Sequence, residues 1–97
     1  MIRFSYPAIK TFIEKHADAT DPMNNWYNIM KISDFADYRE LKQMFATVEG
    51  VGNDRCVFDI KGNKYSVVAM IHFNIRTVYI RFVGSHKQYD KIDARII

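Results

Sequence analysis

Residues 51–90 read VGNDRCVFDIKGNKYSVVAMIHFNIRTVYIRFVGSHKQYD, and this stretch decides the fold. It holds three apolar segments divided by short turns. Most of the side chains that could take part in catalysis or ligand binding lie in or beside it. Short apolar segments bounded by turn residues are typical of strands joined by hairpins. The stretch therefore predicts a small antiparallel sheet.

Each apolar segment has the pattern of a strand. In the first segment Cys56, Phe58 and Ile60 occupy every second position, which is the spacing of side chains on one face of a strand. The sequence KGNK at 61–64 then predicts a tight hairpin, because glycine accepts the positive φ that such turns require. Residues 65–73 and 77–83 follow as a second and a third strand, rich in β-branched and aromatic residues.

Two glycines, Gly50 and Gly52, break the pattern before the first of these strands. If both hairpins keep a simple register, the side chains of the sheet divide between two faces. One face collects Phe58, Ile60, Tyr65, Val67, Ala69, Ile71, Tyr79 and Arg81. The other collects Arg55, Val57, Lys64, Ser66, Val68, Met70, His72, Val78, Ile80 and Phe82. Both sets are largely apolar, so we expect both faces to be covered over much of their area.

The first half of the chain predicts two or three short helices, after a short edge strand expected at residues 1–5. Apolar residues recur there with the spacing of one helical face. The recurring positions are Ala8, Ile9, Phe12, Ile13 and His16, then Met23, Trp26, Tyr27 and Met30, then Leu41, Met44, Phe45 and Val48. Asp21-Pro22 predicts a capped helix start, and Asp37 with Glu40 resembles a capping box. Helices followed by an antiparallel meander indicate one α+β domain over residues 1–97.

Composition and charge narrow the class of protein. With 97 residues and 48% hydrophobic content, the chain is expected to fold around one modest core. Residues 52–97 hold eight Lys/Arg and four Asp/Glu, a balance of +4, whereas residues 1–51 hold six and seven, a balance of −1. A basic second half suits a polyanion or an acidic protein partner. With a single cysteine, no signal sequence and no apolar run of membrane-spanning length, we expect a cytoplasmic protein.

No motif for a metal site, a nucleotide-binding loop or a serine hydrolase occurs in the sequence. The chemistry that remains centres on SHKQYD at 85–90. RNA can be cut without a metal or cofactor, because its own 2′-hydroxyl is the nucleophile and the enzyme supplies a base, fixed cations and an acid. His86 titrates in the useful range, and Tyr89 can donate a proton or stack on a base. The candidate phosphate ligands are Lys61, Lys64, Lys87 and Arg81.

Structural roles can explain the same residues. His86 and Tyr89 can simply cap the last strand, and His72 can be a satisfied histidine among apolar neighbours. Trp26 and Tyr27 can pack in the core or form a surface on which a partner binds. Arg81 can form an ion pair within the fold. Composition alone thus supports a basic α+β domain and no more.

Several short motifs allow comparison with known families. They are VGN at 51–53, VFDI at 57–60, GNKY at 62–65, VAMIH at 68–72, IRFVG at 80–84 and SHKQYDKID at 85–93. Through these motifs, and through the helical pattern with Trp26-Tyr27 and FAD at 35–37, the chain resembles the HigB toxins of bacterial type II toxin–antitoxin modules. HigB toxins belong to the wider RelE-like group of small mRNA-cleaving toxins.

The resemblance implies a RelE-like fold, ribosome-dependent cleavage of mRNA and inhibition of growth. It also implies neutralisation by a HigA-type helix-turn-helix antitoxin, with operator DNA bound only through the toxin–antitoxin complex. His86 matches the histidine of the family's T-H-x-x-Y-D motif, Tyr89 matches its tyrosine, and Lys64 follows Gly-Asn in G-N-x-Y-R. The catalytic residues implied are thus His86, Tyr89 and Lys64, with phosphate bound by Lys61, Ser66, Arg81 and Lys87.

One position departs from the family pattern. Ser66 stands where the family commonly has the arginine that ends G-N-x-Y-R. Serine donates one neutral hydrogen bond, whereas arginine offers a charged and forked set of donors. Either a neighbouring cation such as Lys64 substitutes for the arginine, or this copy is a weakened toxin that binds antitoxin or RNA without cutting. A plain protein-interaction domain with a basic edge is the third hypothesis.

Overall fold

The computed structural model describes residues 6–97, and the edge strand expected at residues 1–5 lies outside them. The helices are α1 (Tyr6–Lys15), η1 (Ala17–Ala19), α2 (Thr20–Ile32), α3 (Tyr38–Met44), η2 (Phe73–Ile75) and α4 (His86–Tyr89). The strands are β1 (Glu49–Gly52), β2 (Arg55–Ile60), β3 (Tyr65–His72) and β4 (Thr77–Ser85). They form one antiparallel sheet in the order β1-β2-β3-β4. The α+β prediction is confirmed.

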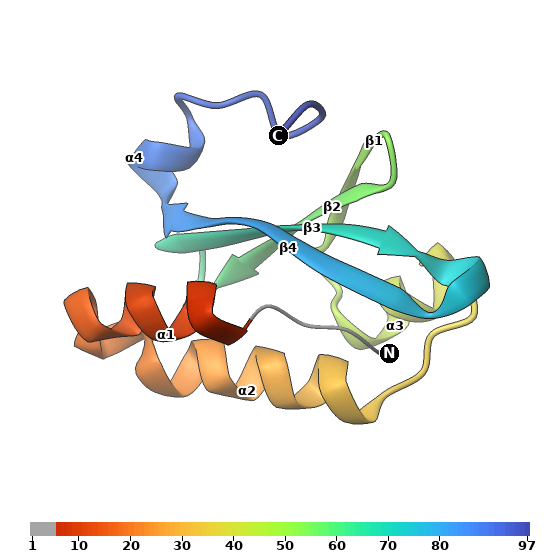
Figure 1. Ribbon diagram of the computed structural model, residues 1–97, viewed down its shortest axis with the longest axis horizontal. Helices are drawn as coiled ribbons and strands as arrows, with labels where there is room; N and C mark the ends of the chain where they lie inside the picture. Colours follow the sequence, from red (N-terminus) through yellow and green to blue (C-terminus); the bar gives the residue numbers. More distant parts are fainter. Residues whose placement is uncertain (1–5) are drawn as a thin grey trace.

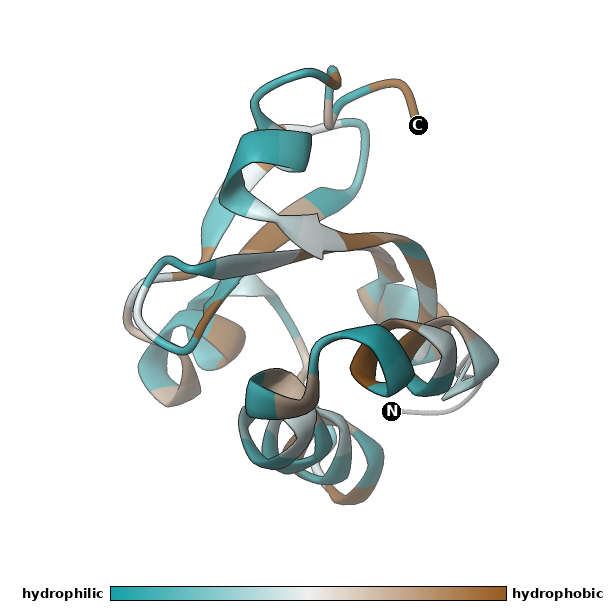
Figure 2. Ribbon diagram, turned by 90° about the vertical axis from the view of Figure 1, so that its left-hand side faces the viewer, coloured by the Kyte–Doolittle hydropathy of each residue, from teal (hydrophilic) through white to brown (hydrophobic). Residues whose placement is uncertain are grey.

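The sheet is covered on both faces, as its apolar pattern predicts. In Figure 1, α1 and α2 lie against one face, and the segment that follows α4 folds back over the opposite face. Figure 2, turned by 90°, shows apolar strands of the sheet between more hydrophilic segments on either side. Within residues 6–97, no helix is long and apolar enough to cross a lipid bilayer.

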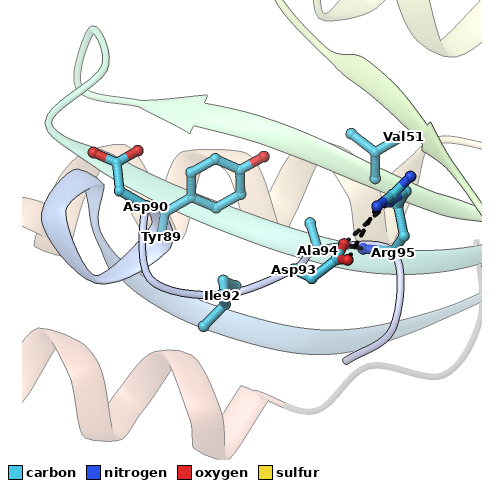
Figure 3. Close-up of a pocket in the computed structure, with 7 residues that line it drawn as sticks. All are labelled: Val51, Tyr89, Asp90, Ile92, Asp93, Ala94 and Arg95. Atoms are coloured by element: carbon cyan, nitrogen blue, oxygen red, sulfur yellow. Dashed lines mark hydrogen bonds and ion pairs between the residues drawn. The ribbon is translucent and has the colours of Figure 1, made fainter.

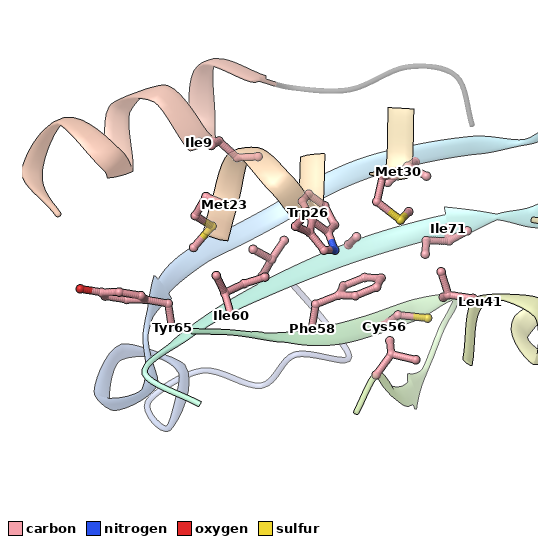
Figure 4. Packing of buried hydrophobic residues seen from close by; sticks show 14 of the residues in the cluster. Ile9, Met23, Trp26, Met30, Leu41, Cys56, Phe58, Ile60, Tyr65 and Ile71 are labelled. Atoms are coloured by element: carbon pink, nitrogen blue, oxygen red, sulfur yellow. The ribbon is translucent and has the colours of Figure 1, made fainter. Parts of the chain in front are cut away.

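The helix-side core joins α2 to the middle of the sheet. Trp26 is 2% exposed and meets Phe58 edge to face, with ring centroids 5.1 Å apart. Phe58 meets Phe45 in the same way at 5.2 Å, and Figure 4 shows Trp26 directed from α2 onto Phe58. A smaller cluster on the other face joins Val57 and Val68 to Ala94 near the C-terminal end of the chain. This second cluster fixes residues 91–97 over the sheet.

The start of α2 differs from the prediction. Asp21 does not cap this helix, which begins at Thr20 with Ala19 at the N-cap position and no capping side chain. The reason is that η1 runs directly into α2, so the backbone is already helical before Asp21 is reached. Asp21 instead places an acidic side chain in the first turn, where its negative charge interacts favourably with the positive end of the helix dipole.

The cap of α3 is confirmed in its main feature. Asp37 accepts a hydrogen bond from Glu40 N at 3.0 Å, as an N-cap aspartate does. The returning bond differs from a true capping box, because Glu40 Oε1 accepts from Ala36 N at 2.8 Å and not from Asp37 N.

β1 is a strand that the sequence does not predict. Gly50 and Gly52 lie in β1, which pairs with β2, and the turn itself is made by Asn53 and Asp54. Both turn residues have positive φ, 52° and 62°, as a tight hairpin turn requires. At Gly50 the reason for glycine is packing, because an added Cβ would lie 3.3 Å from the Tyr38 ring.

A bulge in β4 corrects the predicted division into faces. Val68 pairs with Phe82 but Ala69 pairs with Ile80, so Arg81 has no partner in the ladder. The four positions assigned to the wrong face are Val78, Ile80, Tyr79 and Arg81. Val78 and Ile80 pack in the helix-side core, while Tyr79 and Arg81 lie on the face beneath the C-terminal segment. One extra residue reverses every side chain beyond it.

Cys56 offers a test of the packing. The side chain is 5% exposed, and burial, with a smaller effect of the Asp54 charge, raises the pKa of its thiol to about 11. Since the thiolate is the reactive form, we expect no reaction with a disulfide reagent such as DTNB in native protein at pH 8. Full reaction is expected in denaturant, and stoichiometric labelling of native protein within minutes would contradict the packing described.

Candidate functional site

Most of the predicted site residues lie where β3 begins and β4 ends. Tyr65 pairs with Ser85 across the two strands, and His86 N donates to Lys64 O at 3.0 Å. The main chains of Lys64 and His86 therefore touch, although the residues are far apart in sequence. We call this edge, made of residues 61–65 and 85–90, the basic rim.

A capping box fixes α4 at the basic rim. Ser85 Oγ accepts from Gln88 N at 3.2 Å, and Gln88 Oε1 accepts from Ser85 N at 2.9 Å. The two reciprocal bonds satisfy donors that the helix start would leave open. Gly84 precedes this turn, and an added Cβ there would lie 2.5 Å from the Phe82 ring and 2.8 Å from Gln88 Oε1, so a side chain would displace the glutamine of the capping box. The result is a short helix that presents His86 and Tyr89 from a defined backbone.

His86 is accessible and has a carboxylate neighbour. Its side chain is 53% exposed, and Nε2 lies 3.6 Å from Asp90 Oδ2. Its ring stacks on that of Tyr89, with centroids 6.3 Å apart and planes 28° apart. An exposed imidazole is accessible to a substrate and can act as a general base or a general acid.

Tyr89 is half-buried on the sheet face beside Phe82, with ring centroids 6.5 Å apart. Burial raises the pKa of its phenol, and the nearby carboxylates of Glu49 and Asp59 add to the shift. The hydroxyl therefore stays protonated at neutral pH and is suited to donate. Figure 3 shows the Tyr89 ring pointing along the sheet on the side of Val51, with the Asp90 carboxylate directed away from it.

The two rim lysines converge on one carboxylate that the sequence analysis did not identify. Asp18 Oδ2 lies 2.5 Å from Lys64 Nζ and 3.1 Å from Lys61 Nζ, and Asp18 Oδ1 accepts from the Tyr65 hydroxyl at 2.5 Å. Lys64, then Tyr65 and Lys61, hold the pKa of Asp18 well below its usual range. The same contact with Asp18 raises the pKa of Lys64, so its ammonium stays charged.

Ser66 and Arg81 are placed differently from the rim lysines. Ser66, the second residue of β3, pairs with Asp59 and Gly84 next to the rim, but it is 1% exposed and its Oγ has no hydrogen-bond partner among residues 6–97. Arg81, at the bulge, donates from Nε to the Ile97 main-chain oxygen at 3.2 Å. Arg55 donates to the same oxygen from Nη2 at 2.6 Å. The structure thus brings Arg81 to the C-terminal segment and not to Lys64.

Lys87 is exposed on α4, next to His86 in the chain. His72, by contrast, lies at the opposite end of β3, where Nδ1 is 3.5 Å from Asp54 Oδ2. Among the described residues 6–97, no three His, Cys, Asp or Glu side chains are grouped so as to hold a metal ion. The basic rim thus carries a histidine, a protonated phenol and two lysines paired with Asp18. The histidine and the phenol are groups suited to proton transfer, and lysine is suited to binding phosphate.

Comparisons with known proteins identify the family of the chain. Residues 19–92 match the family described as "HigB_toxin, RelE-like toxic component of a toxin-antitoxin system". The "mRNA interferase toxin HigB" of Escherichia coli K12 is 31% identical over 89 residues, which cover 90% of this chain and 86% of that protein. The "mRNA interferase HigB" of Escherichia coli O6:H1 is 26% identical over 72 residues, 72% of this chain and 70% of that protein. The chain belongs to the HigB family, the RelE-like toxic components of toxin–antitoxin systems.

Proposed function

We propose that this HigB-family toxin is an mRNA interferase, a metal-independent endoribonuclease that cuts ribosome-bound mRNA and thereby inhibits translation and growth. The observation that carries the proposal is the junction of His86 with Lys64 at the basic rim, His86 N to Lys64 O at 3.0 Å. The names of the relatives, mRNA interferases in Escherichia coli, support the same activity.

The groups at the basic rim match the steps of RNA cleavage by the 2′-hydroxyl. A base removes the 2′-hydroxyl proton, cations stabilise the charge that grows on the phosphate, and an acid protonates the departing 5′-oxygen. His86, exposed beside Asp90, serves as base or acid. Tyr89, whose phenol stays protonated, positions the RNA or donates a proton. Lys64 supplies the charge next to the phosphate, with Lys61 and Lys87 on the same edge.

The partners follow from the family and the proposed substrate. A toxin–antitoxin family implies an antitoxin, and we propose a HigA-type protein with a helix-turn-helix domain. Operator DNA would be bound through that complex, and the toxin would act in the cytoplasm, where ribosomes and mRNA are found. The excess of positive charge in residues 52–97 favours association with a polyanion such as rRNA or mRNA.

The proposal is tested by inducible expression in bacteria, with growth followed and mRNA 5′ ends mapped. Growth arrest accompanied by new 5′ ends within coding sequences is the expected result. Arrest without new 5′ ends would contradict the nuclease activity while leaving a toxic binding protein. Co-purification with the product of a neighbouring helix-turn-helix gene tests the antitoxin independently of cleavage.

A catalytically weakened toxin is the second candidate, and Ser66 is the observation that favours it. Ser66 occupies the family's arginine position, and its buried hydroxyl reaches no partner within residues 6–97. Arginine would place a charged, forked donor at this position. If the substitution weakens the enzyme, Ser66→Arg raises the cleavage rate by about a hundredfold, since lost transition-state contacts of this kind cost that much.

The measurement for Ser66→Arg is the single-turnover rate of cleavage of a ribosome-bound mRNA. Ser66→Met, which is long but uncharged, is the matched control, because the site is 1% exposed and any large side chain must displace its neighbours. Equal rates for the unmodified chain and Ser66→Arg would show that the cations present already suffice.

A further inference from the structure

Three donors from one hairpin converge on a single carboxylate of the helical layer. Lys61 and Lys64 flank the β2–β3 turn, and Tyr65 begins β3. Asp18 comes from η1, between α1 and α2. Its carboxylate accepts hydrogen bonds from Lys64 Nζ at 2.5 Å, from Lys61 Nζ at 3.1 Å and from the Tyr65 hydroxyl at 2.5 Å. Two ammonium groups and a hydroxyl around the oxygens of one anion form a complete anion-binding cradle. The cradle is occupied by the chain's own carboxylate.

The same cradle has the composition of a phosphate site. A carboxylate and a phosphodiester each present two anionic oxygens, and lysine binds either as a mobile point charge with three donors. Lys64 is also joined to His86 through the bond from His86 N to Lys64 O. The hairpin that carries the two lysines therefore borders the start of the helix that carries His86.

The contact with Asp18 is open to exchange. The side chains of Lys61, Lys64 and Asp18 are 43%, 57% and 35% exposed. Exposed ion pairs are weak and are screened by salt, so a competing anion can displace one partner without unfolding the protein. Tyr65 is buried at 3% exposure and holds the cradle in place, because its ring packs against Phe12 and His16.

We propose that Asp18 is an internal counter-ion that occupies the RNA-phosphate subsite formed by Lys61, Lys64 and the Tyr65 hydroxyl, and that RNA binds there by displacing it. The proposal rests on the proposed function, since it assumes that the basic rim receives RNA. It adds a residue that limits the affinity for RNA. Asp18 occupies the subsite in the free protein, which lowers this affinity, and it leaves the subsite when a phosphate enters.

The test is the affinity of purified full-length protein for a fluorescent, unstructured 20-nucleotide RNA, measured by anisotropy over a range of NaCl concentrations. We expect Asp18→Asn to strengthen binding by about tenfold at low salt, because both lysines become available to phosphates. The slope of log K against log salt is expected to steepen by about 0.7 for each additional RNA phosphate that the variant neutralises.

Two comparisons separate this mechanism from a general increase in positive charge. Asp34→Asn makes the same chemical change at a carboxylate that pairs with Arg76, Oδ1 to Nε at 2.9 Å, outside the cradle. It is expected to alter affinity far less than Asp18→Asn. In a chain that also carries Lys61→Gln and Lys64→Gln, the strengthening by Asp18→Asn is expected to vanish.

The proposal is overturned if Asp18→Asn and Asp34→Asn strengthen binding equally, or if the strengthening survives without the two lysines. Unchanged affinity in Asp18→Asn overturns it as well. Asp18→Ser repeats the measurement with a smaller uncharged side chain, should Asp18→Asn fold poorly. The binding measurements do not depend on cleavage, so absence of new mRNA 5′ ends would contradict the nuclease and leave the counter-ion test intact.

Discussion

Replacing His86 with alanine is expected to lower the rate of mRNA cleavage by about a hundredfold to ten-thousandfold, the range that general acid–base groups contribute. His86 is the titratable ring that the basic rim presents to solvent at 53% exposure, beside Asp90 and Tyr89. Its backbone bond to Lys64 is made by the main-chain N–H and survives the substitution. The variant should therefore fold and bind antitoxin normally while failing to cut.

The measurement is single-turnover cleavage of ribosome-bound mRNA, with growth arrest and mapped 5′ ends as the cellular counterpart. His72→Ala is the matched control, because His72 also lies beside a carboxylate, Asp54, but at the opposite end of β3. We expect His72→Ala to cleave at close to the unmodified rate. Unchanged cleavage by His86→Ala would remove His86 from the mechanism, whereas equal losses in both variants would indicate a general effect on folding.

The sequence predicts the middle of the sheet well because alternation is a local signal. Every second residue of β2 is apolar, β3 is a continuous apolar run paired with β2 in simple register, and the faces of both strands are assigned correctly. β1 is not predicted because Gly50 and Gly52 look like turn residues, although Gly50 is needed for packing against Tyr38. The bulge at Arg81 is not predicted because an inserted residue leaves the composition of a strand unchanged.

The candidate site is only partly visible in the sequence for a related reason. His86 and Tyr89 stand close together in a motif, so resemblance to a family locates them. Asp18 lies 46 residues from Lys64 and carries no local pattern, so its contact appears only when the helical layer is packed on the sheet. The bonds from Arg55 and Arg81 to Ile97 are long-range in the same sense.

Truncating Phe58 to alanine is expected to cost about 3–5 kcal/mol of unfolding free energy, the range for buried phenylalanines. Phe58 is 2% exposed and meets two rings edge to face, Trp26 at 5.1 Å and Phe45 at 5.2 Å. Its removal opens a cavity where α2 meets the centre of the sheet (Figure 4). Domains of this size have a total stability of about 5–15 kcal/mol, so the variant would be left close to the threshold of folding.

The measurement is the midpoint of urea unfolding, followed by circular dichroism and by the release of the Cys56 thiol. Ile32→Ala is the control, because Ile32 is 83% exposed on α2 and its truncation should change stability by less than about 0.5 kcal/mol. Cys56 lies in the same buried cluster as Phe58, so loosening of this core should expose the thiol together with the loss of helix signal. If Phe58→Ala unfolds at the same urea concentration as Ile32→Ala, then the packing of α2 on β2 is not what holds the helical layer to the sheet.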